Sequence, residues 1–357
     1  MTARVRVGVA GVGHWATTAH MPSIRAHPMA DLVAIADPYR ENLERARRAF
    51  DVPVAFADPL EMLATSELDG VVVATTHASH YEIALQAIRS GRHVLVEKPF
   101  VLDPAHGREL IEAAAAQGVE IIVGYPWHYN QQSLLARRWI ADGRLGSLTF
   151  VDSFFGSSPV DLFRGRPEAY LEYGQGVSFF GPRPATYSER GLAGGGQGQT
   201  QMTHSLALLL FLTGLVPTRV AAFMESLDAP VDVIDALSIR FEGGAIGSAS
   251  SIGAVTPLEH TELLEYRIHG SRGHLQFDVM EGRLSSWTAG GSTDAPPLPA
   301  HERYPLLSPA TNLIDVAIGR AENGSDATVA QLTVELLDAA YRSAGSDGAA
   351  LDVGTRA

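Results

Sequence analysis

The first third of the chain alternates between short apolar segments and segments of helical composition. Six apolar segments are separated by five helical ones and cover residues 5–10, 32–37, 53–58, 70–76, 93–99 and 120–126. Several are apolar at nearly every position, which is typical of strands buried on both faces. Strict alternation of strand and helix predicts an α/β domain with a doubly wound parallel sheet.

Composition excludes several classes of protein. The chain has 357 residues, enough for two domains, and no cysteine, so disulfides, thiolate metal sites and cysteine nucleophiles are absent. Its formal charge of -13 disfavours binding to nucleic acid or anionic membrane through bulk charge. The histidines show no metal-ligand spacing, and no metal is expected. Because no signal peptide or membrane span is evident, we expect a cytoplasmic protein.

The turn after the first apolar segment carries a phosphate-binding pattern. Gly11, Gly13 and Ala16 occupy the positions of a Gly-x-Gly-x-x-Ala motif between strand and helix. Gly11 would permit a tight turn, Gly13 the close approach of a pyrophosphate, and Ala16 close packing of the helix. The pyrophosphate would lie at a helix N-terminus, where unpaired N–H groups favour an anion. His14 and Trp15, inside the turn, are expected to contact the cofactor.

Asp37 follows the second apolar segment at the place where a dinucleotide-binding domain carries an acid. A carboxylate there can accept hydrogen bonds from the adenosine ribose and would repel a 2′-phosphate, so NAD is expected. An aspartate before Pro38 also favours a turn independently of any cofactor. Arg40 offers a partner for a 2′-phosphate, and NADP is therefore not excluded.

Three motifs together resemble the Gfo/Idh/MocA family of NAD(P)-dependent oxidoreductases. They are "AGVGHWA" at 10–16, "VLVEKPF" at 94–100 and "GGGQGQTQMTHSLALLLFLTG" at 194–214, in an order that suits the family over nearly the whole chain. The resemblance implies a Rossmann domain over residues 1–124 and a second domain over 125–357 built on a large open antiparallel sheet. It also implies closing helices within 309–345 that pack back toward the Rossmann domain, and a homodimer or homotetramer.

The residues after position 125 support an α+β second domain independently. Short alternating segments broken by glycine cover 145–157, 219–227, 235–253, 265–278 and 282–291, as expected for strands and hairpins. A helix is expected from about Gln201 to Leu212. Residues 154–176 are expected to form a long loop over the cleft, in which Arg166 would bind substrate or a neighbouring subunit.

Lys98 ends the fifth strand of the series. The carboxyl ends of parallel strands face the ligand crevice, so Lys98 is expected near the nicotinamide, where its ammonium would stabilise a developing alkoxide. Glu97 is expected to bind the nicotinamide ribose or orient Lys98. A surface Glu-Lys pair before a turn is the alternative, and the strand on which it falls makes it less favoured. In similar proteins Pro99 often follows a cis peptide, which is expected here too.

His204 is expected to act as general base, because a histidine titrates near neutrality. In the family an aspartate usually stands four residues before it, on the same helix face. Here Thr200 takes that place and offers a hydrogen bond but no charge. A core histidine bonded to backbone is therefore a serious rival interpretation.

Further expected contacts follow other strands. Thr75, Thr76 and His77 end the fourth strand and His80 opens the next helix, where the family usually contacts the cofactor. Substrate contacts are expected from Tyr125, Trp127 and His128, beside Lys98, Thr200, His204 and Arg166. Aromatic faces stack on sugar rings, and amides and hydroxyls near Thr200 suit a polyhydroxylated ligand. For Trp127 a hydrophobic domain junction is an equal alternative.

Three functions remain open from the sequence. The favoured one is an NAD-dependent dehydrogenase that oxidises a secondary hydroxyl of a sugar, glycoside or cyclitol. The second is redox-neutral glycoside cleavage, in which a tightly bound NAD oxidises a ring carbon transiently before the aglycone is eliminated. The third is a non-catalytic sensor that binds NAD and a sugar, against which the presence of Lys98 and His204 argues.

Overall fold

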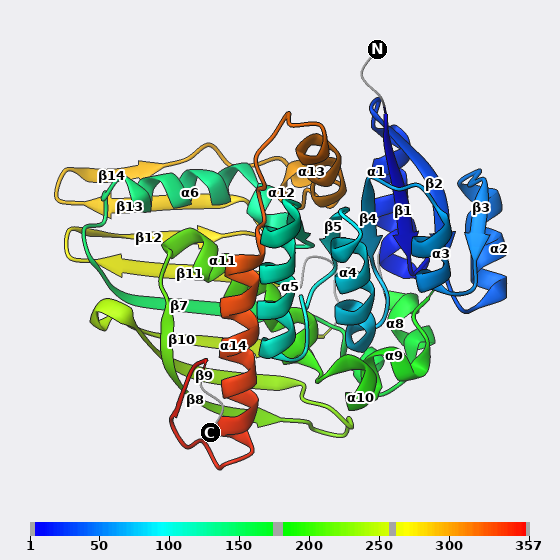
Figure 1. Cartoon of the computed structure of the whole chain (residues 1–357). Coiled ribbons are helices and arrows are strands. Elements are labelled where there is room, and N and C mark those ends of the chain that lie inside the picture. The colour runs from blue at the N-terminus through cyan, green and yellow to red at the C-terminus, as the bar shows by residue number, and fades with distance from the viewer. Residues whose placement is uncertain (1–3, 174–180, 257–261, 355–357) are drawn as a thin grey trace.

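The computed structural model describes residues 4–173, 181–256 and 262–354, which form two β-sheets surrounded by helices (Figure 1). The first sheet has six strands in the order β3-β2-β1-β4-β5-β6, and all its pairings are parallel. Its strands are β1 (Val5–Ala10), β2 (Ala30–Ala36), β3 (Val54–Phe56), β4 (Gly70–Val73), β5 (His93–Val96) and β6 (Ile121–Val123). This is the strand order of a Rossmann fold, and the predicted doubly wound sheet is confirmed.

Helices cover both faces of the parallel sheet. They include α1 (Met21–Ala26), α2 (Arg40–Ala49), α3 (Pro59–Thr65), α4 (His80–Arg89) and α5 (Pro104–Gln117). One face is also covered by α13 (Ser308–Ala317), whose Leu313 and Ile314 are fully buried in its core. The other face packs against α3, α4, α5 and the first half of α14 (Ala327–Ala344).

The second sheet has nine strands in the order β14-β13-β12-β11-β7-β10-β9-β8-β15. They are β7 (Leu148–Gly156), β8 (Pro217–Glu225), β9 (Ile234–Phe241), β10 (Ile246–Ile252), β11 (Leu263–Gly270), β12 (Gly273–Asp278), β13 (Arg283–Thr288), β14 (Gly291–Asp294) and β15 (Leu351–Asp352). Every pairing is antiparallel except that of β7 with β10. The predicted large antiparallel sheet is confirmed, with that one parallel pair inside it.

One face of the second sheet is covered by α6 (Gln131–Ala141), α11 (Thr203–Thr213) and α14. In Figure 1, α14 crosses the strands and α6 runs alongside β13 and β14. Helix α14 contributes Leu336 and Leu337 to this core and Ala330 and Val334 to the core of the parallel sheet. Helix α11 likewise contributes Ala207 to the core of the parallel sheet and Leu206 to that of the second sheet, so these two helices tie the sheets together. None of the helices within the described ranges is long and apolar enough to cross a bilayer.

Two segments differ from what the sequence predicts. The stretch 154–173, expected as a loop, contains α7 (Val160–Phe163) and α8 (Pro167–Tyr173), while 174–176 lie outside the described residues. Pro167 begins α8, because its fixed φ suits the first turn of a helix. The helix expected from Gln201 begins earlier, with a π-helical turn Gly198–Met202 that runs directly into α11.

The glycines before that turn are required by close packing. Asp232 accepts hydrogen bonds from the N–H groups of Gly196 and Gly198, both at 2.8 Å, and from the hydroxyl of Tyr341 at 3.0 Å. A methyl group on Gly195 would collide with the Tyr341 hydroxyl, and one on Gly196 with the carbonyl oxygen of Asp232. The segment is thereby pinned against α14 and directs the chain into the turn that carries Thr200.

Asp235 lies beside this anchor at the start of β9. It is fully buried, and neither of its carboxyl oxygens has a hydrogen-bond partner of ordinary geometry among the described residues. Burial raises the pKa of Asp235 well above its usual value, and the negative charge of Asp232 adds to the rise. Asp235 therefore keeps its proton to a higher pH than an exposed aspartate does.

Replacing this acid with its neutral isostere is expected to remove a pH-dependent loss of stability. Because folding raises the pKa of Asp235, the folded chain keeps a proton that the unfolded chain releases above about pH 4. The contribution of Asp235 to the free energy of unfolding is complete below about pH 4. It declines as the pH rises toward the raised pKa, by up to about 1.4 kcal/mol per pH unit.

Between pH 5 and pH 8, the melting temperature of Asp235→Asn should therefore rise relative to that of the wild type. Asp294→Asn, at an exposed position on β14, is the matched control. Parallel curves for the wild type and Asp235→Asn would contradict the assignment of the proton.

Candidate active site

The turn after β1 leaves room for a phosphate group beside Gly13. Gly11 has a φ of 85°, and a side chain there would collide with the carbonyl of Ala74. By contrast, nothing lies within 4 Å of the position that a Cβ on Gly13 would take. The backbone at Gly13 is thus open to close approach, as the predicted pyrophosphate site requires.

Asp37 lies just beyond the end of β2, against this turn. Its two carboxylate oxygens accept hydrogen bonds from the N–H groups of Val12 at 3.0 Å and Tyr39 at 2.9 Å. Burial raises the pKa of Asp37, and these two N–H groups oppose the rise. Each oxygen retains a further lone pair for a ribose hydroxyl.

Lys98 lies just beyond the carboxyl end of β5 and reaches the second domain. Its ammonium donates a hydrogen bond to the main-chain carbonyl of Thr200 at 2.8 Å. Burial lowers the pKa of Lys98, and the charge of Glu97 opposes that effect. The peptide bond between Lys98 and Pro99 is cis, as expected.

Glu97 is paired with a histidine that the sequence analysis missed. His20, fully buried, lies with its Nε2 2.8 Å from Glu97 Oε1, while Glu97 Oε2 accepts the N–H of Lys98 at 3.1 Å. His20 belongs to a π-helical turn, Ala16–His20, that follows the glycine motif. Its position one helical turn after Ala16 could have suggested that it faces the same crevice.

His204 lies at the start of α11 among aromatic rings. Its ring centroid is 5.3 Å from that of Trp127 and 5.8 Å from that of Tyr125. Burial lowers the pKa of His204 well below its usual value, and the charge of Lys98 lowers it further. The imidazole is therefore neutral at pH 7, beside a cationic lysine.

Several buried polar atoms on residues linked to His204 by ring contacts or by closeness in sequence have no partner in the described part of the chain. Among the described residues, no hydrogen bond is made by Thr200 Oγ1, Gln199 Oε1, His204 Nδ1, Trp127 Nε1 or Trp15 Nε1. Buried polar atoms in folded proteins nearly always have a partner, so a group of unpaired ones indicates a ligand site. The set offers both donors and acceptors and comes from both domains.

Tyr304 packs against two of these residues and was not predicted from the sequence as a site residue. Its ring lies 4.9 Å from that of Trp127 and 6.1 Å from that of Trp15. It lies near the end of the chain, between α12 (Ala300–Arg303) and α13, and no motif marks it. Tyr125 belongs to the same surround, but its hydroxyl already bonds Thr203 Oγ1 at 3.0 Å.

Other residues predicted to contact the cofactor are hydrogen-bonded to neighbouring groups of the protein. His80 contacts the carbonyl oxygens of Pro99 at 2.9 Å and Thr75 at 3.2 Å. The Thr75 hydroxyl accepts a hydrogen bond from Ser79, which is also 3.2 Å from the hydroxyl of Thr76. These residues border the carboxyl end of β4, and their contact with a cofactor stays a prediction.

Two further predicted substrate residues make contacts of their own with the protein, although His128 Nε2 has no hydrogen-bond partner of ordinary geometry among the described residues. His128 bonds Ser325 Oγ through Nδ1 at 3.0 Å and stacks on Phe211 at 4.2 Å. Arg166 is exposed, and its charge helps to lower the pKa of Asp228 on the surface. Their roles in binding stay predictions.

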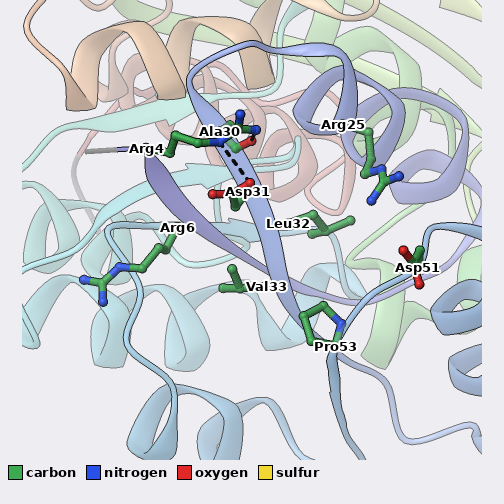
Figure 2. Close-up of a pocket in the computed structure, with 9 residues that line it drawn as sticks. All are labelled: Arg4, Arg6, Arg25, Ala30, Asp31, Leu32, Val33, Asp51 and Pro53. Atoms are coloured by element: carbon green, nitrogen blue, oxygen red, sulfur yellow. Dashed lines mark hydrogen bonds and ion pairs between the residues drawn. The ribbon is translucent and has the colours of Figure 1, made fainter. Parts of the chain in front are cut away.

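A surface hollow elsewhere on the Rossmann domain lies at the wrong end of the sheet for a dinucleotide. It is lined by residues at the amino ends of β1 and β2, including Arg4, Arg6 and Asp31, and the arginine Arg4 pairs with Asp31 (Figure 2). Ligands of open α/β sheets bind at the carboxyl ends of the strands. The candidate site therefore lies around Lys98 and not in this hollow.

Both parts of the chain match known protein families. Residues 5–125 match an oxidoreductase family with an NAD-binding Rossmann fold, and residues 133–276 match the GFO/IDH/MocA C-terminal domain. The first domain is thus an NAD-binding Rossmann domain.

Two curated relatives are similar to part of the chain. Inositol 2-dehydrogenase 4 of Saccharopolyspora erythraea is 32% identical over 143 residues, which are 40% of this chain and 42% of the relative. D-apiose dehydrogenase of Paraburkholderia graminis is 30% identical over 148 residues, 42% of this chain and 39% of the relative. The chain thus aligns with less than half the length of these relatives.

A solved structure extends the similarity to both domains. GenD2 from gentamicin A biosynthesis, crystallised in complex with NAD, is 26% identical, with a TM-score of 0.79 and coverage of 99% of this chain and 98% of that one. With a Rossmann domain and a C-terminal domain of the same family in sequence, the chain belongs to the Gfo/Idh/MocA family of oxidoreductases.

Proposed function

We propose that the protein is an NAD-dependent dehydrogenase that oxidises a secondary hydroxyl of an uncharged sugar or cyclitol. The observation that carries this proposal is the pairing of a cationic lysine with a neutral histidine. Lys98 donates to the Thr200 carbonyl at 2.8 Å, and its charge lowers the pKa of His204. A hydroxyl between them would meet a hydrogen-bond donor and a base together.

The residues present fit the cofactor. The open backbone at Gly13 would approach the diphosphate, the remaining lone pairs of Asp37 would accept the adenosine ribose hydroxyls, and Glu97 lies beside Lys98 at the nicotinamide end. When bound there, NAD would take up the hydride that leaves the substrate carbon.

The chain's own groups would handle the hydroxyl proton. His204 is neutral and its Nδ1 has no partner among the described residues, so it can accept a hydrogen bond from the substrate hydroxyl. Because burial and the charge of Lys98 lower the pKa of His204, the proton would pass to it only as the hydride leaves and the hydroxyl becomes strongly acidic. Lys98, held by the Thr200 carbonyl, would donate a hydrogen bond to the substrate oxygen as negative charge develops there. Burial keeps water from competing for both contacts and strengthens their electrostatic effect.

The substrate class follows from the unpaired atoms, all of which are uncharged. They belong to an amide, a hydroxyl, an imidazole and two indoles, so beside the cationic Lys98 they offer neutral donors and acceptors that match hydroxyl groups. Trp127 and Tyr304 add ring faces for the C–H surface of a sugar. Relatives named as inositol and D-apiose dehydrogenases support a neutral polyol.

We also infer that the exposed face of the nine-stranded sheet joins subunits into a homodimer or homotetramer. Phe150 of β7 and Ile246 of β10 are register partners on that face and are 38% and 48% exposed. Leu263 of β11 adds a third apolar side chain at 43% exposure. Phe150 and Ile246 lie side by side and form one exposed apolar pair on the open sheet, and adjoining apolar side chains on a surface favour an interaction site.

Lys98→Met is expected to abolish turnover while leaving the fold intact. The variant keeps the length of the side chain but removes the ammonium, so kcat with NAD and a panel of sugars, glycosides and inositols should fall about 10²–10³-fold. Reduced nicotinamide is followed by its absorbance, and NAD affinity is measured alongside. Wild-type protein that holds NAD but reduces none of it on any substrate would contradict the dehydrogenase and favour redox-neutral glycoside cleavage.

Thr200→Asp is expected to raise the pKa of Lys98 by restoring a carboxylate beside it. Lys98 is the only lysine of the chain, so reductive ¹³C-methylation gives one lysine signal for titration by NMR. Burial lowers its pKa in the wild type, and the new charge should move it up by about 1 unit or more. Thr200→Val, without a charge, is the control, and equal pKa values in all three proteins would contradict the placement.

Ile246→Asp should lower the oligomeric state if the exposed sheet face is an interface. A buried, unpaired carboxylate would oppose association strongly. Light scattering should give a multiple of 38.1 kDa for the wild type and a smaller mass for the variant. Leu134→Asp, at a similarly exposed position on α6, is the control, and a monomeric wild type at micromolar concentration would refute the inference.

A further inference from the structure

A segment of the second domain crosses the edge of the Rossmann sheet where a dinucleotide binds. This strap, residues 181–193, contains α9 (Pro184–Ser188) and α10 (Arg190–Ala193) and lies beside the Rossmann domain in Figure 1. It precedes the glycine-rich segment that leads to Thr200 and His204. The strap therefore connects directly to the candidate catalytic helix.

The strap is attached at two points on either side of β1. Near its start, the guanidinium carbon of Arg183 lies 3.0 Å from the centroid of the Tyr39 ring, just after β2. At its end, the carbonyl of Ala193 lies 2.9 Å from Nδ1 of His77, just after β4. In the sheet β1 lies between β2 and β4, so the strap spans the carboxyl end of β1 and its glycine turn.

Further contacts make the attachment specific. The ring of Tyr187 in α9 meets that of His77 edge to face, with centroids 5.8 Å apart. At the other end, Tyr39 donates its N–H to Asp37, the residue expected at the adenosine ribose. Arg183 is also close enough to Asp37 for its charge to lower the pKa of that carboxyl against the effect of burial.

We propose that the strap is a cofactor-binding element of the second domain, with Arg183 stacked against the adenine of the dinucleotide. The inference rests on the proposed cofactor site but not on the reaction. One face of the planar guanidinium lies on Tyr39, and Arg183 is otherwise exposed, so its other face is free for an aromatic base. The strap covers the diphosphate between its two attachments, and release of the cofactor requires the Arg183 contact to break.

ADP-ribose is the probe that isolates this end of the site, because it lacks the nicotinamide. Isothermal titration should show that Arg183→Ala raises its Kd about tenfold, and NAD, bound through the same end, should weaken equally. Arg183→Lys keeps the positive charge but lacks the planar guanidinium, so its Kd should be raised as much as that of Arg183→Ala. Arg190→Ala, an exposed arginine on the same strap, should bind like the wild type.

The rate of cofactor release should rise as the affinity for the cofactor falls. Protein loaded with NADH and chased with excess NAD should lose its NADH about tenfold faster when residue 183 is alanine. A Kd and a release rate within twofold of the wild type in a folded Arg183→Ala protein would overturn the proposal. Wild-type affinity in Arg183→Lys would overturn the stacking. A protein that oxidises no sugar but shows these binding changes would refute the proposed reaction and leave the strap assignment standing.

Discussion

The hydrogen bond from Lys98 to the carbonyl of Thr200 is the contact on which the rest of the site depends. It joins Lys98, just beyond the end of β5, to a helical turn 102 residues later in the chain, with Lys98 Nζ 2.8 Å from the carbonyl oxygen. It is a direct contact between the two domains. The acceptor is a neutral carbonyl, so it positions the ammonium without neutralising it. Burial lowers the pKa of the nearby His204, and the charge of Lys98 lowers it further, so the imidazole stays neutral.

That contact needs rigid support from both sides. On the Rossmann side, Glu97 is occupied by His20 and by the N–H of Lys98, so it orients the lysine without forming a direct ion pair with its ammonium. On the other side, Asp232 accepts two glycine N–H groups and thereby holds the backbone just before Thr200. The backbone that carries the carbonyl is thus held by the side chain of Asp232, so its position does not depend on the side chain at residue 200, where a threonine stands and the family usually has an acid.

Local sequence patterns predicted those residues of the candidate site whose position depends on one strand and the turn that follows it. Gly11, Gly13, Asp37 and Lys98 all follow from where parallel strands end, which hydrophobic periodicity shows. The partners of these residues could not be predicted in the same way. His20 and Glu97 are 77 positions apart, Tyr304 carries no motif, and their meeting depends on how the domains pack.

The glycine-rich segment shows the same limit. Its amides and hydroxyls suggested a surface turned wholly toward a ligand. In the structure Gln197 instead bonds Ser251 at 2.6 Å, inside the second domain, and the glycines are required by Asp232 and Tyr341. Gln199 Oε1, Thr200 Oγ1 and also Gln197 Oε1 have no partner among the described residues, so a composition typical of a binding surface serves packing in part and leaves the remaining polar atoms for a ligand.

The connection of the strap to this segment has a consequence for how the two halves of the site cooperate. Ala193, attached to His77, is followed immediately by the glycines that Asp232 holds, and these lead to Thr200 and His204. A movement that lifted the strap from the Rossmann domain would pull on the same backbone that supplies the acceptor for Lys98. In the proposed site, about seven residues of chain thus separate the strap's attachment to the Rossmann domain from the carbonyl that accepts the hydrogen bond of Lys98.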